Sequence, residues 1–174
     1  MPAIETRRSA APRAVWTGAV FAALAAILLL LGTGSAHWWS GEKGGLESAV
    51  GLRAFELCHG DVCRSRALEG MGSEAWMLLG RLGTWTGGLT GLFLVLAAAA
   101  VVLYRAGFWP RLFGRVGAAL SLISLVVGSG FAWKYPGFSG LGAGWAMAAY
   151  LGGAALGVGS AGLLIAGGAA RQAP

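Results

Sequence analysis

Long apolar runs dominate the pattern of hydrophobic and polar positions along the chain. A membrane-spanning helix needs about 20 mostly apolar residues, whereas the strands of a membrane β-barrel alternate over about 10 residues. The long runs in this chain do not alternate. We therefore predict four transmembrane helices, over residues 14–36, 82–104, 116–133 and 143–168.

The composition agrees with a membrane protein. Hydrophobic residues make up 56% of the 174 residues and charged residues only 11%, against roughly 25% charged residues in an average soluble domain. Disordered chains combine low hydrophobicity with high net charge, so disorder is excluded as well. We expect an all-α membrane protein whose four helices form a transmembrane bundle.

The charges between the runs predict the orientation. The first connection holds six of the seven acidic residues, whereas the N-terminal tail and the middle connection hold three arginines each. Loops rich in Lys and Arg stay on the cytoplasmic side. We therefore place the tails 1–13 and 169–174 and the loop 105–115 in the cytoplasm, and the loops 37–81 and 134–142 outside. Arginine far outnumbers lysine, which we read as typical of a bacterial protein and hence of the inner (plasma) membrane.

The first run has a second interpretation as a cleaved signal peptide. Arginines precede it, and Gly34, Ser35 and Ala36 end it with the small residues of a cleavage site. A secretory apolar core is about 7–15 residues long, and the charge-free stretch here is longer. We therefore expect an uncleaved helix, with the signal peptide as the alternative.

Tryptophans gather near the ends of the predicted spans. Amphipathic indole rings favour the interface between membrane and water. The positions predict an interfacial belt made of Trp16, Trp38, Trp39, Trp76, Trp109, Trp133 and Trp145.

Small residues recur at helical spacing in two of the runs. Gly87 and Gly91 are four residues apart in the second run, and Gly153, Gly157 and Ala161 follow the same spacing in the fourth. Small residues at this spacing let helix backbones approach closely. We predict that they form packing faces, within the bundle or against other membrane proteins.

The two cysteines, Cys58 and Cys63, flank a predicted turn. Residues before Cys58 alternate between two faces, and Gly60-Asp61 can supply the turn. A hairpin closing there brings the cysteines opposite each other, within disulfide reach, in a loop that we place in an oxidising compartment. We predict a structural disulfide in a small extracytoplasmic β-hairpin or sheet.

Three other activities stay open at this stage. A membrane thiol–disulfide exchange enzyme also has four helices, although it uses a Cys-x-x-Cys pair. A metal site would have to recruit His37 and His59 at spacings wider than zinc sites use. The third alternative is a small pore. Pumps and proton-coupled transporters are not expected, because they use ionisable groups within the membrane and the predicted spans contain no Asp, Glu, Lys or His. We predict no metal, no cofactor and no nucleic acid.

The topology and the first loop resemble the claudin and peripheral myelin protein superfamily. Its loop signature is a tryptophan, then Gly-Leu-Trp, then two cysteines. The residues that carry the resemblance here are Trp38 or Trp39, Gly51, Leu52, Phe55, Cys58 and Cys63. The resemblance implies a left-handed four-helix bundle with a small extracellular sheet, and a non-enzymatic role in adhesion, barrier formation or accessory-subunit assembly.

These observations lead to one functional prediction and one alternative. We expect a structural or accessory membrane protein that associates with other membrane proteins or with itself in the lipid bilayer. The alternative is a thiol–disulfide redox enzyme that uses Cys58 and Cys63.

Overall fold

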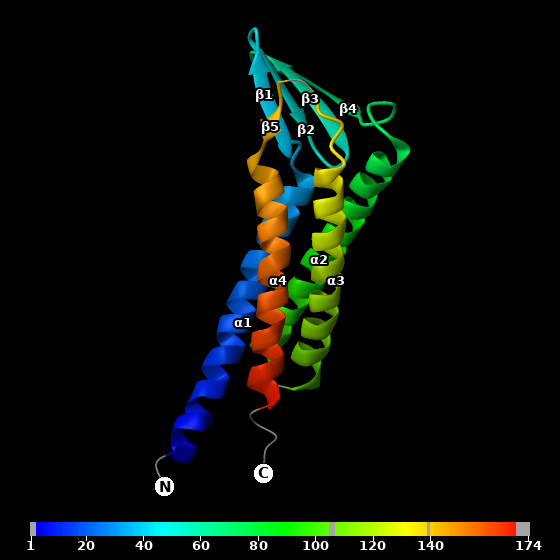
Figure 1. The fold of residues 1–174 in the computed structure, drawn as a ribbon. Coiled ribbons are helices and arrows are strands. Elements are labelled where there is room, and N and C mark those ends of the chain that lie inside the picture. The colour runs from blue at the N-terminus through cyan, green and yellow to red at the C-terminus, as the bar shows by residue number, and fades with distance from the viewer. Residues whose placement is uncertain (1–2, 105–106, 139, 170–174) are drawn as a thin grey trace.

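Four long helices stand side by side and a small sheet covers one end of them (Figure 1). In this computed structural model the backbone is described for residues 3–104, 107–138 and 140–169, and the side chains for 13–104, 107–138 and 140–166. Each helix has a segment long and apolar enough to cross a membrane. The helices are α1 (Ala3–Gly34), α2 (Glu74–Tyr104), α3 (Phe108–Trp133) and α4 (Trp145–Ala169).

The helices form a ring in which α1 packs on α2 and α4, and α3 packs on the same two helices. Small side chains fill the interior of this ring, including the fully buried Ala22, Ala97 and Ala154. Large aliphatic side chains lie on the outside, where Leu103 and Val126 are each 73% exposed. This distribution is the reverse of the one in a water-soluble bundle, whose large apolar residues lie in the core.

The helices do not end where the predicted spans end. The backbone of α1 is helical from Ala3, within the predicted tail, and α1 stops at Gly34. Helix α2 begins at Glu74, before residue 82, because the Oγ of Ser73 caps it by accepting the backbone N–H of Trp76 at 3.2 Å. Charged residues limit the apolar segment of a helix, but they do not stop the helix itself.

The middle connection is shorter than the predicted loop 105–115. Helix α3 begins at Phe108, while residues 105–106 lie outside the described part of the chain. Pro110 fits in the first turn of α3 because a backbone N–H there has no helical partner. Helix α4 begins at Trp145 rather than at residue 143, since Gly142–Ala143 forms a short strand.

The sheet has five antiparallel strands in the order β4-β3-β2-β1-β5. The predicted hairpin is confirmed as β3 (Ala54–His59) and β4 (Val62–Ala67), which turn at Gly60 with a φ of 58°. A second hairpin, β1 (Trp39–Lys43) and β2 (Leu46–Val50), turns at Gly44 and Gly45. Both glycines have positive φ angles, 63° and 77°, as a two-residue hairpin turn requires.

Strand β5 (Gly142–Ala143) joins the sheet from the connection between α3 and α4. It pairs with Trp39 and Ser40 at the edge of β1. The backbone N–H groups of Gly144 and Ala146 then donate to the carbonyl oxygens of Trp38 and His37, at 2.7 and 3.2 Å. The connection from α1 to α2 and the end of the connection from α3 to α4 are therefore hydrogen-bonded to each other in one sheet.

Candidate functional site

An aromatic core joins the sheet to the helices, and it corrects the predicted tryptophan belt. Trp38, Trp39 and Trp76 are buried beside Phe131 and Tyr150 instead of facing the membrane interface. The Trp76 and Phe131 rings stack with centroids 4.8 Å apart. Trp16, Trp109, Trp133 and Trp145 are exposed, so an interfacial belt stays a prediction for these four.

Two of the buried tryptophans complete the ends of helices. The indole N–H of Trp38 donates to the carbonyl of Gly32, in the last turn of α1, at 2.7 Å. The indole N–H of Trp76 donates to the carbonyl of Phe131, near the end of α3, at 3.2 Å. The last carbonyls of a helix have no helical partner, so each indole both fills the core and satisfies a buried acceptor.

Tyr135 extends the aromatic core beyond the end of α3. Its ring stacks on Trp39 with centroids 4.2 Å apart, and its hydroxyl donates to the carbonyl of Phe138 at 3.4 Å. Burial raises the pKa of Tyr135 above its ordinary value of 10.0. The stacked ring packs the start of the connection from α3 to α4 against β1.

The signature residues Gly51 and Leu52 form a wedge between α1 and α2. A Cβ on Gly51 would lie 2.7 Å from Ala36 Cα and from the Ser35 carbonyl oxygen, so only glycine fits there. The side chain of Leu52 is buried against α2. Of the other two signature residues, Trp39 lies in the aromatic core and Phe55 packs partly buried against it.

The register divides the sheet into two faces of opposite charge. Successive residues of a strand point to opposite faces, and paired residues share a face. The pairs Glu42–Glu47, Glu47–Cys58 and Glu56–Ser65 therefore place three carboxylates on the face of the disulfide. We call this the acidic face.

The opposite face is apolar and basic. At its base Trp39 and Val50 enter the aromatic core. Farther from the helices, the apolar side chains of Leu46, Leu57 and Val62 are exposed, and Val62 is 65% exposed. Lys43, Arg64 and Arg66 accompany them. We call the exposed part, made of these six residues, the basic face.

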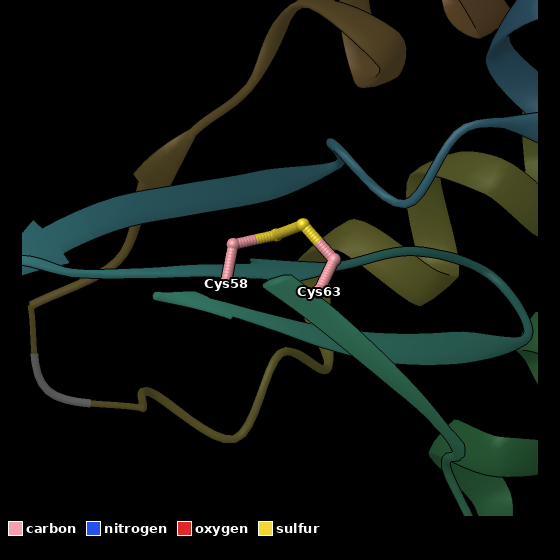
Figure 2. Close-up of a disulfide and its surroundings, with 2 residues drawn as sticks. All are labelled: Cys58 and Cys63. Atoms are coloured by element: carbon pink, nitrogen blue, oxygen red, sulfur yellow. A yellow bond between two sulfur atoms is a disulfide. The ribbon is translucent and has the colours of Figure 1, made fainter. Parts of the chain in front are cut away.

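The predicted disulfide is confirmed. Cys58 and Cys63 are paired residues of β3 and β4, with Cα atoms 4.0 Å apart, and Figure 2 shows their sulfurs joined on one side of the sheet. Cys63 is exposed and Cys58 half-buried. The cross-link fixes the register of the edge hairpin, and the described residues contain no free cysteine.

The structure does not bring the two histidines together. His37 precedes β1 at the base of the sheet and stacks on Trp145 with centroids 6.3 Å apart. His59 lies at the far end of β3, paired with Leu46 and Val62. Among the described residues no group of three or more His, Cys, Asp or Glu side chains could hold a metal ion.

The predicted packing residues all face other helices of the same chain. A Cβ on Gly153 would lie 2.9 Å from the Ala25 carbonyl oxygen, and one on Gly91 would lie 3.2 Å from Leu30. The hydroxyl oxygen of Ser121 occupies the space that a Cβ on Gly157 would need.

The same close approach occurs at the remaining predicted positions. A Cβ on Gly87 would lie 2.5 Å from the Thr33 hydroxyl oxygen, and Ala161 is buried. These five small residues therefore hold this bundle together, and they are not free for a partner protein.

Tyr150 is a central residue that the sequence pattern did not reveal. Its ring is fully buried in a slot made by glycines of the three other helices. A Cβ on Gly87 or Gly128 would lie 2.6 or 2.7 Å from the ring, and a Cβ on Gly32 would lie 2.7 Å from the Tyr150 Cβ. Its hydroxyl donates to the Gly83 carbonyl at 2.9 Å, so Tyr150 links all four helices just below the sheet.

Comparison with known proteins assigns the chain to no family. No protein-family model matches it, and no curated protein matches its sequence. The functional inference therefore depends on the geometry of the sheet, the aromatic core and the bundle.

Proposed function

We propose that this protein is a non-catalytic membrane protein that binds other proteins through its sheet. The observation that carries the proposal is the two-faced sheet, which the aromatic core fixes to the bundle. Trp38 and Trp76 are fully buried and hydrogen-bonded to helix ends. A surface held in this way is pre-organised, and pre-organisation lowers the entropic cost of binding.

The distribution of side chains over the helices supports a transmembrane position. Lipid tails are as apolar as leucine, so large aliphatic side chains can face outward while small residues pack inside. The bundle has this arrangement, and two of its interior hydroxyls, Thr90 Oγ1 of α2 and Ser124 Oγ of α3, are hydrogen-bonded to each other at 2.9 Å. The sheet then lies at one membrane surface, and the loop charges predict that this surface is the outer one.

The basic face is the surface that we assign to a partner. Exposed Leu57 and Val62 beside Arg64 and Arg66 favour a partner surface that is both apolar and acidic. The acidic face of a second copy, with Glu42, Glu47 and Glu56, has the complementary charge. Self-association by opposite faces agrees with the claudin-like assembly role that the loop signature implies. Binding of a different protein by the basic face would agree with the adhesion or subunit role that the same signature implies.

A photoreactive amino acid at Val62 tests this proposal. We expect a covalent adduct with a protein in native membranes, identified by mass spectrometry. The matched control is Val126, which is 73% exposed on α3 and should give no protein adduct. Arg64→Glu with Arg66→Glu should lower the Val62 yield about tenfold or more, because like charges across an interface cost several kcal/mol. Equal yields at Val62 and Val126 would contradict the proposal.

Thiol–disulfide exchange is the second candidate, and the exposure of Cys63 favours it. If the disulfide is structural, Cys58 and Cys63 resist alkylation in native membranes until a reductant is added. Cys58→Ser with Cys63→Ser should then lower stability by about 2 kcal/mol, the expected effect of a short closed loop. Free alkylation without reductant, together with loss of a thiol-exchange activity in the double variant, would favour the enzyme.

A further inference from the structure

A groove on the surface of the bundle lies between α1 and α2, at the ends of these helices that are next to the sheet. Its volume is about 770 Å³, within the range of about 300–1,000 Å³ typical of small-molecule sites. Thr33 of α1, the buried Leu52 and Leu68 below the sheet, and one face of α2 line it. The packing glycines and the basic face contribute no residue to this groove.

The end of the groove next to the sheet is charged. Arg53, Arg81 and Glu69 lie there, and two guanidinium groups with one carboxylate leave a net charge of +1. Arg81 Nη2 is 3.6 Å from Glu69 Oε1, and both side chains are largely exposed. An exposed pair of this kind contributes little to stability, so Arg81 can also contact an anionic group.

The other end is apolar and open. Trp85, Leu89 and Leu92 line it, and Trp85 is 72% exposed. A Cβ on Gly88 would meet no atom within 4 Å, so the glycine leaves free space in the groove. From residue 81 to residue 92 the helix rises about 16 Å, roughly half of the 30 Å apolar thickness of a bilayer.

We propose that this groove binds one anionic phospholipid from the leaflet on the sheet side. The phosphate lies between the guanidinium groups of Arg53 and Arg81, and an acyl chain runs past Gly88 towards Leu92. A lipid of charge −1 neutralises the net charge of the site. In phosphatidylglycerol the head-group hydroxyls can also donate to the Glu69 carboxylate.

The charge at the sheet end of the groove favours an anionic lipid, because two guanidinium groups and one carboxylate lie there. Arginine at the head-group level also fits the phosphate geometrically, because its planar fork can donate two parallel hydrogen bonds.

Lipid retention by the full-length protein tests the proposal. The protein is purified in detergent, mixed with equal amounts of phosphatidylglycerol and phosphatidylethanolamine with identical acyl chains, and examined by native mass spectrometry. We expect one retained lipid per chain. Phosphatidylglycerol should exceed phosphatidylethanolamine about threefold, a preference of the size that an exposed ion pair gives.

Two sets of substitutions separate the head-group end from the acyl end. Arg53→Gln with Arg81→Gln should remove the preference and bring the ratio of the two lipids to about one. Gly88→Leu places a side chain in the groove without a clash and should reduce retention of both lipids. Gly159→Leu is the matched control, because a Cβ there also meets no atom within 4 Å, and it should retain lipid as the wild type does.

Several outcomes would overturn the proposal. These are equal retention of both lipids by the wild type, a preference for phosphatidylethanolamine, and equal retention by the Gly88→Leu and Gly159→Leu variants. A dimer mass that disappears on Gly88→Leu would assign the groove to a second copy of the chain. Thermal unfolding of each variant shows whether it is folded, and Gly88→Leu should be as stable as the wild type, since leucine favours the helix more than glycine does.

Discussion

At the scale of single residues, tryptophan has two different roles in this protein. Trp133 and Trp145 are exposed, as expected of indoles near a membrane interface. Trp38 and Trp76 are buried, and each donates a hydrogen bond to a carbonyl at a helix end. The difference comes from their place in the fold: both buried tryptophans lie where the chain passes between the helices and the sheet.

The indole caps lead to the first prediction. Trp38→Phe keeps an aromatic ring in the core but leaves the Gly32 carbonyl without its donor. An unsatisfied buried acceptor costs about 1–3 kcal/mol, so we expect the free energy of unfolding in detergent to fall by that amount. Trp133→Phe is the control, because Trp133 is 90% exposed and its substitution should have little effect. Equal stability of the two variants would show that the cap contributes nothing.

At the scale of elements, the helices are held together by close backbone contact. Glycine and alanine line the contacts between helices, and serine and threonine hydroxyls fill part of the remaining space. In a bilayer, apolar area gives no preference for helix over lipid, so contact depends on van der Waals packing and hydrogen bonds. A single large side chain in such a contact must separate two helices.

Gly157 and Gly159 of α4 provide a matched test of this packing. Gly157 is buried beside Ser121 and Leu94, whereas Gly159 is exposed and a Cβ there meets nothing within 4 Å. Gly157→Leu should lower the free energy of unfolding by about 1–3 kcal/mol, the usual cost of overpacking. Gly159→Leu should leave it unchanged. Denaturation in mixed micelles measures both, and a stable Gly157→Leu variant would refute the packing model.

At the scale of the whole molecule, the protein has two distinct ends. The sheet covers one end of the bundle, and the C-terminal ends of α2 and α4 and the start of α3 lie at the other (Figure 1). Six of the seven acidic residues lie in the sheet, in the approach to α2 or at the first residue of α2. The charge asymmetry read from the sequence is therefore an asymmetry between the two ends of the molecule.

This asymmetry predicts the orientation in the membrane. A cysteine introduced at Lys43, which is exposed in β1, should react with an impermeant thiol reagent added to intact cells. A cysteine introduced at Ala106, in the connection between α2 and α3, should react only after the membrane is opened. The reverse pattern would contradict the orientation that the positive loops predict.

The sequence by itself determined the features that depend on neighbouring residues. The length and hydropathy of the four runs were enough to predict four membrane-competent helices, because the backbone of a spanning segment must satisfy its own hydrogen bonds. The alternation before Cys58, with a turn at Gly60, was enough to predict the hairpin and its disulfide. The Gly44-Gly45 turn was an equally strong local signal for the first hairpin, which the prediction did not use.

Only the tertiary structure decided which surfaces meet. Local sequence places Trp38 and Trp76 near span ends, but it does not show that the sheet covers them and turns their indoles towards helix ends. It likewise does not show that β5 joins the sheet from a distant loop, or that Tyr150 fills a slot between glycines of three helices. These features depend on residues far apart in the chain, and their contacts exist only when the helices and the sheet have packed together.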